Sequence, residues 1–311
     1  MNYIDKSFYG LTAYLSKLTE EEIFENIKYS YLNVSDEIKN GIEDFFKKFN
    51  YWGTLDYKRN DYEELRRRAN SIHNHLEAFI WLYDNLEDYR SKKLLYAILS
   101  NWYRYDFKEL KECYETQYPD YFDLDIVKCD EKEVLVDLGA YTGDTILDYL
   151  RLYDDKYKRI YCYEITDESF NQLKDNLSRY RDIVLCKKAV IDVESTMYIK
   201  ENEFGSPDAN NIASEGSKEI NVVTIDNDIK EKITMIKMDI EGIEYKTLLG
   251  CKKHIEEDAP KLLISVYHNH EDIWRIPRLI DSIKPGYKFW LRYHGNNIFP
   301  TEVTLIAIYE D

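Results

Sequence analysis

The amino-acid sequence predicts an α/β fold, in which an α-helical N-terminal region precedes a Rossmann-like parallel sheet with an antiparallel hairpin at its C-terminal edge. Three observations support this prediction. Residues 1–117 carry helical patterns, whereas from residue 134 onward short apolar runs alternate with helical segments. The last two strand patterns, residues 287–293 and 303–309, follow one another without a helix between them, which indicates an edge hairpin.

Composition and charge limit the classes of function. The chain has 311 residues, enough for one large domain or two smaller ones, and its net charge of −17 argues against nucleic acid as a partner. Five cysteines without a Cys-x-x-Cys pair suggest reduced thiols. The sequence shows no signal-peptide pattern and no apolar run of membrane-spanning length. We therefore expect a cytoplasmic protein without a membrane partner.

The N-terminal region carries helix-start signals. Thr19–Glu22 and Asp61–Glu64 have the form of capping boxes, and Ser35 and Ser91 stand where N-caps are expected. Apolar residues then recur in steps of three and four from Leu65 to Leu86, which predicts one continuous stripe on one helix. The stripe indicates the spine of a helical bundle, with a homodimer seam as the alternative.

Basic residues are dense only at Arg66–Arg68. We interpret this cluster as a solvated face that pairs with nearby glutamates, and binding of a phosphorylated acceptor is the alternative. Residues 118–132 are polar and interrupted by Pro119, so we place the domain junction there. The predicted domains are a helical accessory domain, residues 1–117, and a Rossmann-like domain, residues 118–311.

The stretch from Val134 to Thr145 is the strongest motif. A buried parallel strand is predicted by its apolar start, and Asp137, Gly139 and Gly143 then form a tight turn ahead of a helix. Glycines allow the backbone to approach a ligand, and a helix N-terminus presents N–H groups to it. The spacing is Gly-x-x-x-Gly rather than the Gly-x-Gly-x-x-Gly of dinucleotide sites, so an amino-acid-like ligand fits better than a pyrophosphate.

The next predicted strand, residues 159–165, contains Glu164, which lies 21 residues beyond Gly143. A carboxylate at this place can accept both ribose hydroxyls of an adenosine. NAD enzymes and methyltransferases share this geometry, so Glu164 indicates a ribose without distinguishing the cofactor.

The remaining strands follow in order. Residues 183–190 read as a third strand, and residues 196–200 and 220–225 as an inserted hairpin. The polar loop between the hairpin strands, residues 201–218, is either a substrate lid or a surface excursion. Residues 233–250 predict a buried strand, an acidic turn and a helix that ends at Gly250, and residues 261–270 a strand that ends in two histidines.

Together these motifs resemble the FkbM family of methyltransferases over residues 118–309. The resemblance rests on Tyr121-Phe122, on Val134–Thr145, which is similar to motif I of class I S-adenosylmethionine-dependent methyltransferases, on Glu164, and above all on the block from Lys237 to Glu244 before Leu248-Leu249-Gly250. It implies methyl transfer from S-adenosylmethionine to a hydroxyl oxygen of a sugar, glycan or secondary metabolite.

The resemblance also implies roles for individual residues. Asp137, Gly139, Tyr141, Gly143 and Asp144 would form the cradle for the methionine end, Glu164 would bind the ribose, Ala189 and Val190 would flank the adenine, and Asp239 would contact the cofactor. The chain departs from the family pattern at Ser265-Val266-Tyr267, where other members often carry an acid.

Three residues are the catalytic candidates. We expect His268 to be the general base, because an imidazole with an ordinary pKa near 6.5 suits proton abstraction at neutral pH. Capping of the strand or hydrogen bonding to Asp239 is the alternative for His268, and His270 ranks second as base. Asp239 and Glu241 would orient the cofactor or the acceptor. A divalent metal is disfavoured, because two carboxylates lack a third ligand.

Two other classes of function remain open. An NAD-dependent oxidoreductase or epimerase would use the same ribose carboxylate, but it usually needs the tighter glycine fingerprint and a Tyr-x-x-x-Lys pair. A non-catalytic protein that binds the cofactor and recognises a partner through its helices would retain the same acids.

Overall fold

The computed structural model describes residues 1–49, 53–200, 211–213, 218–295 and 300–310. The chain divides into two compact units, both built from separate stretches. Unit 1 contains Met1–Thr116, Val266–Arg278 and Lys288–Thr304, and unit 2 contains Gln117–Ser265, Leu279–Tyr287 and Leu305–Asp311. Among the described helices, none combines the length and apolar character that crossing a bilayer requires.

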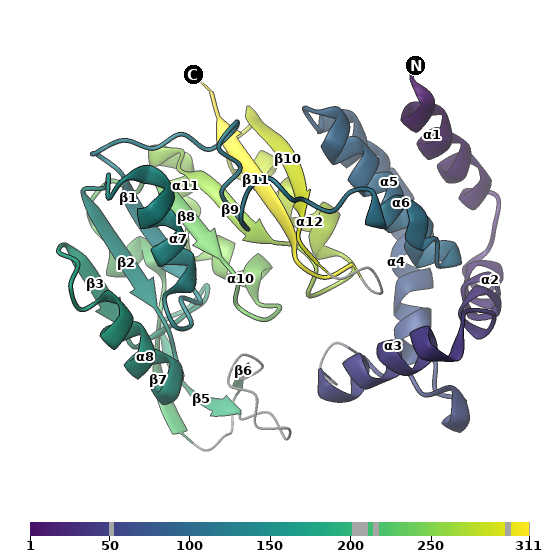
Figure 1. The fold of residues 1–311 in the computed structure, drawn as a ribbon, viewed down its shortest axis with the longest axis horizontal. Helices are drawn as coiled ribbons and strands as arrows, with labels where there is room; N and C mark the ends of the chain where they lie inside the picture. The colour runs from purple at the N-terminus through teal and green to yellow at the C-terminus, as the bar shows by residue number, and fades with distance from the viewer. Residues whose placement is uncertain (50–52, 201–210, 214–217, 296–299, 311) are drawn as a thin grey trace. The chain divides into compact units, whose positions relative to one another are not determined.

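Unit 1 is built mainly from the helices of the N-terminal region (Figure 1). These are α1 (Tyr3–Leu15), α2 (Glu20–Leu32), α3 (Asp36–Lys48), α4 (Glu63–Asn85), α5 (Tyr89–Arg104) and α6 (Phe107–Lys111), with a short 3₁₀ turn at Tyr57–Arg59. Helix α4 packs against α1, α2 and α5. The helical N-terminal region is therefore confirmed.

Two of the predicted helix starts are confirmed. Thr19 and Glu22 form a reciprocal capping box at α2, and the Ser35 hydroxyl accepts a hydrogen bond from the N–H of Ile38 at the start of α3. Both satisfy backbone donors that the first helical turn leaves without an intrahelical acceptor.

The other two are wrong. The predicted capping box of Asp61 and Glu64 does not form, and the N-cap of α4 is Tyr62, whose side chain makes no cap bond. Asp61 accepts from the N–H of Glu63 at 3.3 Å through Oδ1 and from the Thr54 hydroxyl through Oδ2. The N-cap of α5 is Asp88, whose carboxylate accepts from the N–H of Ser91 at 2.8 Å. An acid three residues upstream therefore takes the place predicted for Ser91.

The predicted stripe on α4 is buried along most of its length, but the helix is not continuous. His75 has φ −128° and ψ 22°, so α4 bends there. Leu65 and Phe79, on either side of the bend, are both fully buried, whereas Leu76 beside it is only half-buried. Periodicity alone does not show a kink, because each half keeps its own apolar face.

The basic cluster of α4 is not a uniformly solvated face. Arg66 does pair with Glu21 at 3.0 Å and is largely exposed. Arg68, by contrast, is fully buried, and its guanidinium pairs with the equally buried Glu64 at 2.5 Å. The pairing with glutamates was thus predicted, and the burial of Arg68 was not.

The described strands form two sheets, the larger of which has seven strands; Figure 1 shows their arrangement. Its strands are β1 (Val134–Leu138), β2 (Arg159–Tyr163), β3 (Ile183–Cys186), β8 (Met235–Met238), β9 (Lys261–Ser265), β10 (Tyr287–Tyr293) and β11 (Val303–Tyr309), in the order β10-β11-β9-β8-β1-β2-β3. The pairs β1–β2, β2–β3, β1–β8 and β8–β9 are parallel. The predicted α/β fold class is confirmed.

The chain reverses its direction of growth at β1. It adds β2 and β3 on one side, and β8 and β9 on the other. In open α/β sheets, ligands bind outside the carboxyl ends of the strands at such a switch point. The carboxyl ends of β1 and β8 are therefore the place for a site.

The connecting helices are α7 (Asp144–Tyr153), α8 (Asp167–Leu177), α9 (Ile225–Asp228), α10 (Glu244–Leu249), α11 (Lys252–Asp258) and α12 (Asp272–Ile283). Helix α7 starts directly after Gly143, and α10 ends before Gly250, both as predicted. Helix α11 follows two residues later and was not predicted as a separate element.

The predicted third strand, residues 183–190, is wrong as one element. It divides into β3 and β4 (Ala189–Val190), and β4 belongs to a second sheet with the order β4-β7-β5-β6. The predicted hairpin is confirmed, since β5 (Ser195–Lys200) pairs antiparallel with β7 (Lys218–Val223). Of the polar loop, residues 201–218, for which a substrate lid and a surface excursion were both left open, only β6 (Asn211–Ala213) and Lys218 lie within the described residues.

Candidate active site

The site begins with a buried ion pair between β1 and β8. Asp137 is 0% exposed, and the Lys237 ammonium lies 3.1 Å from its Oδ1 and donates to the carbonyl oxygen of Gly139 at 3.0 Å. Burial raises the pKa of Asp137 to about 6, although Lys237 opposes the shift. Asp137 therefore pairs with Lys237, and Lys237 in turn donates a hydrogen bond to the backbone of the glycine turn.

Lys237 has several acidic neighbours. Burial alone would lower the pKa of its ammonium, but the nearby Asp137 and Asp239 carboxylates raise it. Asp144, at the start of α7, acts in the same direction. One lysine thus faces three carboxylates, so the formal charge of this group is negative.

Gly139 is required by a close approach within the chain. Its φ is +79°, and a Cβ built on it would lie 1.8 Å from the carbonyl oxygen of Asp239. The N–H of Asp239 in turn donates to the carbonyl of Leu138 at 3.0 Å. The turns after β1 and β8 therefore pack backbone to backbone, and only glycine fits at position 139.

We expect Gly139→Ala to lower the free energy of unfolding by about 1–3 kcal/mol, because the added methyl group must displace backbone atoms. Urea denaturation measures the change. Gly10→Ala in α1 is the matched control: its Cβ would meet nothing within 4 Å, so stability should stay the same or rise. Equal stability of Gly139→Ala and wild type would contradict this account of the turn.

Glu164 ties the glycine turn to the end of β2. Its Oε1 accepts from the N–H groups of Ile165 and Thr166 and from the Thr166 hydroxyl at 2.7–2.8 Å. Its Oε2 accepts from the N–H of Tyr141 at 3.0 Å, where the backbone has φ +45°. Oε1 accepts three of these bonds and Oε2 only one, so Oε2 keeps a lone pair that a further donor could use.

The remaining cradle residues lie around this turn. Gly143, with φ +86°, is the N-cap of α7, and its backbone packs closely against Leu173 of α8. The Tyr141 side chain is 40% exposed. Ala189 and Val190 are both buried, Ala189 in an apolar cluster of the second sheet, and their contact with adenine stays a prediction.

The acidic turn after β8 is built around strained backbone and one buried acid. Glu241 has φ +59° and Gly242 has φ +98°. The fully buried Glu244 carboxylate accepts from the N–H groups of Ile240 and Gly242 at 3.0 and 3.3 Å. A non-glycine residue in this conformation persists only where its surroundings hold it, which is frequent at functional sites.

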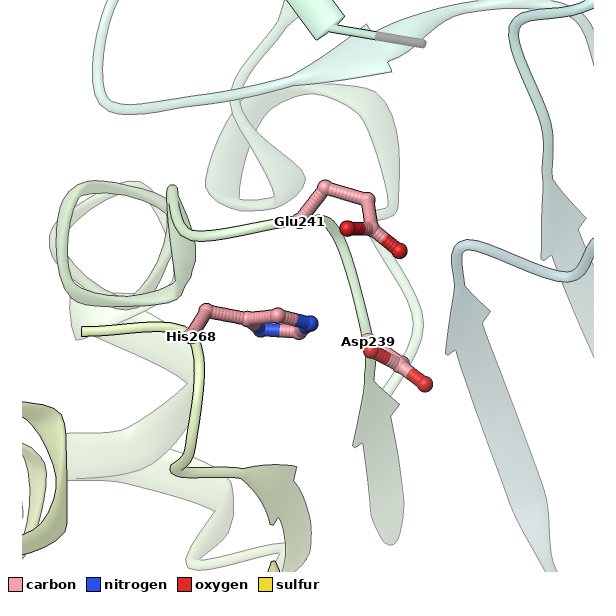
Figure 2. Close-up of side chains that lie close together, drawn as sticks. All are labelled: Asp239, Glu241 and His268. Carbon is pink, nitrogen blue, oxygen red and sulfur yellow. The ribbon is translucent and has the colours of Figure 1, made fainter. Parts of the chain in front are cut away.

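The three predicted catalytic side chains lie close together (Figure 2). One ligand-type atom from each of Asp239, Glu241 and His268 lies within 4.8 Å of the others, and the imidazole is only 3% exposed. Such a group can accept a proton from a hydroxyl. The same three side chains also have the donor types of a divalent metal site. The sequence argument against a metal counted only the two carboxylates, and His268 is the third possible ligand.

Comparison with known proteins assigns the family. The family model described as the methyltransferase FkbM domain matches residues 137–296, which is more than half of the chain. The chain belongs to the FkbM methyltransferase family. A solved structure of methyltransferase FkbM from Methylobacillus flagellatus KT matches with TM-score 0.65 and 25% identity, over 85% of this chain and 65% of that one. The chain thus spans less than two thirds of that relative.

Two other solved structures match at lower similarity. A putative methyltransferase from Streptococcus mutans, in complex with SAH, matches with TM-score 0.37 and 13% identity, over 58% of this chain and 89% of that one. Fibrillarin from Aeropyrum pernix, with natively bound S-adenosyl-L-methionine, matches with TM-score 0.38 and 11% identity, over 58% and 67%. The search of curated proteins returned no match.

His270 has a structural role in this FkbM protein. Its Nε2 lies 3.1 Å from Oε1 of the buried Glu64, and its ring packs edge-on against Trp102 at 5.0 Å between centroids. These contacts belong to unit 1. They do not favour His270 as the second candidate for the base.

Sequence reasoning missed two residues of the FkbM site. Glu244 was seen only as part of the motif, although it fixes the acidic turn. Tyr121 was noted for the resemblance, but its hydroxyl donates to Oδ2 of Asp239 at 2.8 Å. Both residues stand in the motifs on which the resemblance rests. Their hydrogen-bond partners could not be predicted, because the fold decides which residues they contact.

Proposed function

We propose that the protein transfers a methyl group from S-adenosylmethionine to a hydroxyl oxygen of a sugar, glycan or secondary metabolite. The observation that carries the proposal is the charge at the switch point, where the carboxylates of Asp137, Asp144 and Asp239 all raise the pKa of the Lys237 ammonium. Bound S-adenosylmethionine would supply an electrophilic methyl group on a cationic sulfonium centre. A net negative cradle favours such a cation and disfavours the pyrophosphate of NAD.

The residues of the site suit the needs of methyl transfer. The acceptor oxygen must lie in line with the methyl group, so fixed turns that orient both partners supply much of the rate. Gly139 and Glu164 fix the turn after β1, and Glu244 fixes the turn after β8. His268 is the proposed base, and a positioned base contributes about 10²–10⁴-fold.

Isothermal titration calorimetry with S-adenosylhomocysteine and with NAD tests the cofactor. We expect binding of S-adenosylhomocysteine and no measurable binding of NAD. Preference for NAD would support the oxidoreductase alternative. Binding of S-adenosylhomocysteine without methyl transfer to any of a panel of sugars, glycans and hydroxylated metabolites would favour the non-catalytic binding protein.

We expect Glu164→Ala to weaken S-adenosylhomocysteine binding by about 1–3 kcal/mol, the range for losing a hydrogen bond to a charged group. The loss would come from the ribose contact, from the Tyr141 turn, or from both. Calorimetry measures it, with Glu168→Ala, an exposed acid of α8, as the control. Unchanged affinity of the Glu164 variant would remove this residue from the cofactor site.

A further inference from the structure

Tyr121 connects the ends of two strands at the carboxyl edge of the sheet. Its hydroxyl lies 2.8 Å from Oδ2 of Asp239, which follows β8, and 3.0 Å from Oγ of Ser265, which ends β9. The geometry points to Tyr121 as a positioning residue, which orients the Asp239 carboxylate toward the cofactor. This inference rests on the proposed methyltransferase function.

The hydrogen bonds have a defined direction. A phenol has one proton, and an ionised carboxylate only accepts, so Tyr121 donates to Asp239. Its oxygen then accepts from the Ser265 hydroxyl. Ser265 is 1% exposed and Tyr121 is 6% exposed, so these hydrogen bonds are shielded from water. Ser265 therefore acts on the Asp239 carboxylate through the Tyr121 hydroxyl.

The ring of Tyr121 links the same carboxylate to the cradle. The Lys237 ammonium lies 5.1 Å from the ring centroid, a cation–π distance. Lys237 also pairs with Asp137 and donates to the Gly139 carbonyl. Tyr121 thus contacts both the lysine that holds the turn after β1 and the acid of the turn after β8.

The backbone of Tyr121 is held in an unusual conformation. Its φ is +67°, which residues with a Cβ rarely adopt, and its N–H donates to the side chain of Asp120 at 3.0 Å. Strained positions of this kind cluster where a side chain must point in one direction. Here the strained residue is the one whose hydroxyl reaches Asp239.

Experiment can distinguish whether the Tyr121 hydroxyl orients the Asp239 carboxylate or only stabilises the fold. The backbone of Asp239 is already fixed, because its N–H donates to the carbonyl of Leu138. Removing the hydroxyl of Tyr121 therefore takes one hydrogen bond from the carboxylate and leaves the backbone bond of Asp239 in place. Cofactor affinity should change far more than stability.

Calorimetry on Tyr121→Phe, Ser265→Ala and the double variant tests the inference in the full-length protein. We expect S-adenosylhomocysteine affinity to fall about tenfold in Tyr121→Phe and about threefold in Ser265→Ala, since a bond to a charged group is lost or weakened. The double variant should bind no more weakly than Tyr121→Phe, because Ser265 acts only through Tyr121. Tyr153→Phe, which loses a hydrogen bond to the Val127 carbonyl, is the control and should bind as wild type.

Four results would overturn the inference, and the first two concern affinity alone. One is affinity of Tyr121→Phe within twofold of wild type, and the other is full additivity of the two single effects. A fall in affinity that only matches a fall in melting temperature would assign a structural role instead. If wild type binds neither S-adenosylmethionine nor S-adenosylhomocysteine, the proposed function fails, and the inference fails with it.

Discussion

Replacing His268 with alanine should lower kcat by about two to four orders of magnitude, the usual contribution of a general base. The imidazole is 3% exposed, and one of its nitrogens lies within 4.8 Å of carboxylate oxygens of Asp239 and Glu241. Cofactor affinity should be nearly unchanged, because the role lies in the transition state. Single-turnover methyl transfer and calorimetry measure the two quantities separately.

A matched control is His254→Ala in α11. His254 is also buried, but its Nδ1 pairs with Asp258 at 2.6 Å, away from the acidic turn. Single-turnover rates of His268→Ala within threefold of wild type would move the role to Asp239 or Glu241. A chelator distinguishes a general base from a metal site at Asp239, Glu241 and His268. Inactivation by EDTA, with recovery on adding Mg²⁺ or Mn²⁺, would identify the three side chains as metal ligands.

The elements predicted best from the sequence are those whose ends are marked by residues within the same segment. Strand β1 ends in the glycine turn, and β10 follows the turn at Pro285-Gly286, so their ends are marked by residues within the segment itself. The division of residues 183–190 is different. Ala189 and Val190 pair with Val222 and Val223, more than 30 residues later, and no pattern within the segment shows that partner.

The same distinction applies to the site. The motif located Asp137, Gly139 and Asp239, because glycines and acids after buried strands are visible locally. It did not show that Gly139 packs against the Asp239 backbone, or that Tyr121 reaches across 118 positions to the same acid. Side chains that hold a site in place usually come from distant segments, so their function appears only when the fold is known.

Asp137→Ala should lower the free energy of unfolding by about 3–5 kcal/mol, the range for breaking a buried ion pair by removing one partner. The variant leaves the Lys237 ammonium, whose side chain is 4% exposed, without its closest carboxylate. Urea denaturation measures the loss. The double variant Asp137→Leu, Lys237→Met should recover most of it, because an apolar pair of similar volume leaves no buried charge.

Lys237→Met removes the other partner of the ion pair and leaves the Asp137 carboxylate unpaired by it, so stability should depend on pH. Burial already raises the pKa of Asp137 to about 6, above its ordinary value of 3.8, and loss of Lys237 removes a group that opposes this rise. A carboxyl group with a raised folded-state pKa binds its proton more tightly in the folded protein. The contribution of Asp137 to the stability of Lys237→Met should therefore be greatest at low pH and fall as the pH rises from about 4 through the folded-state pKa of Asp137. Asp137→Ala lacks this group and should show no such fall, so parallel pH profiles for the two variants would contradict the buried ion pair.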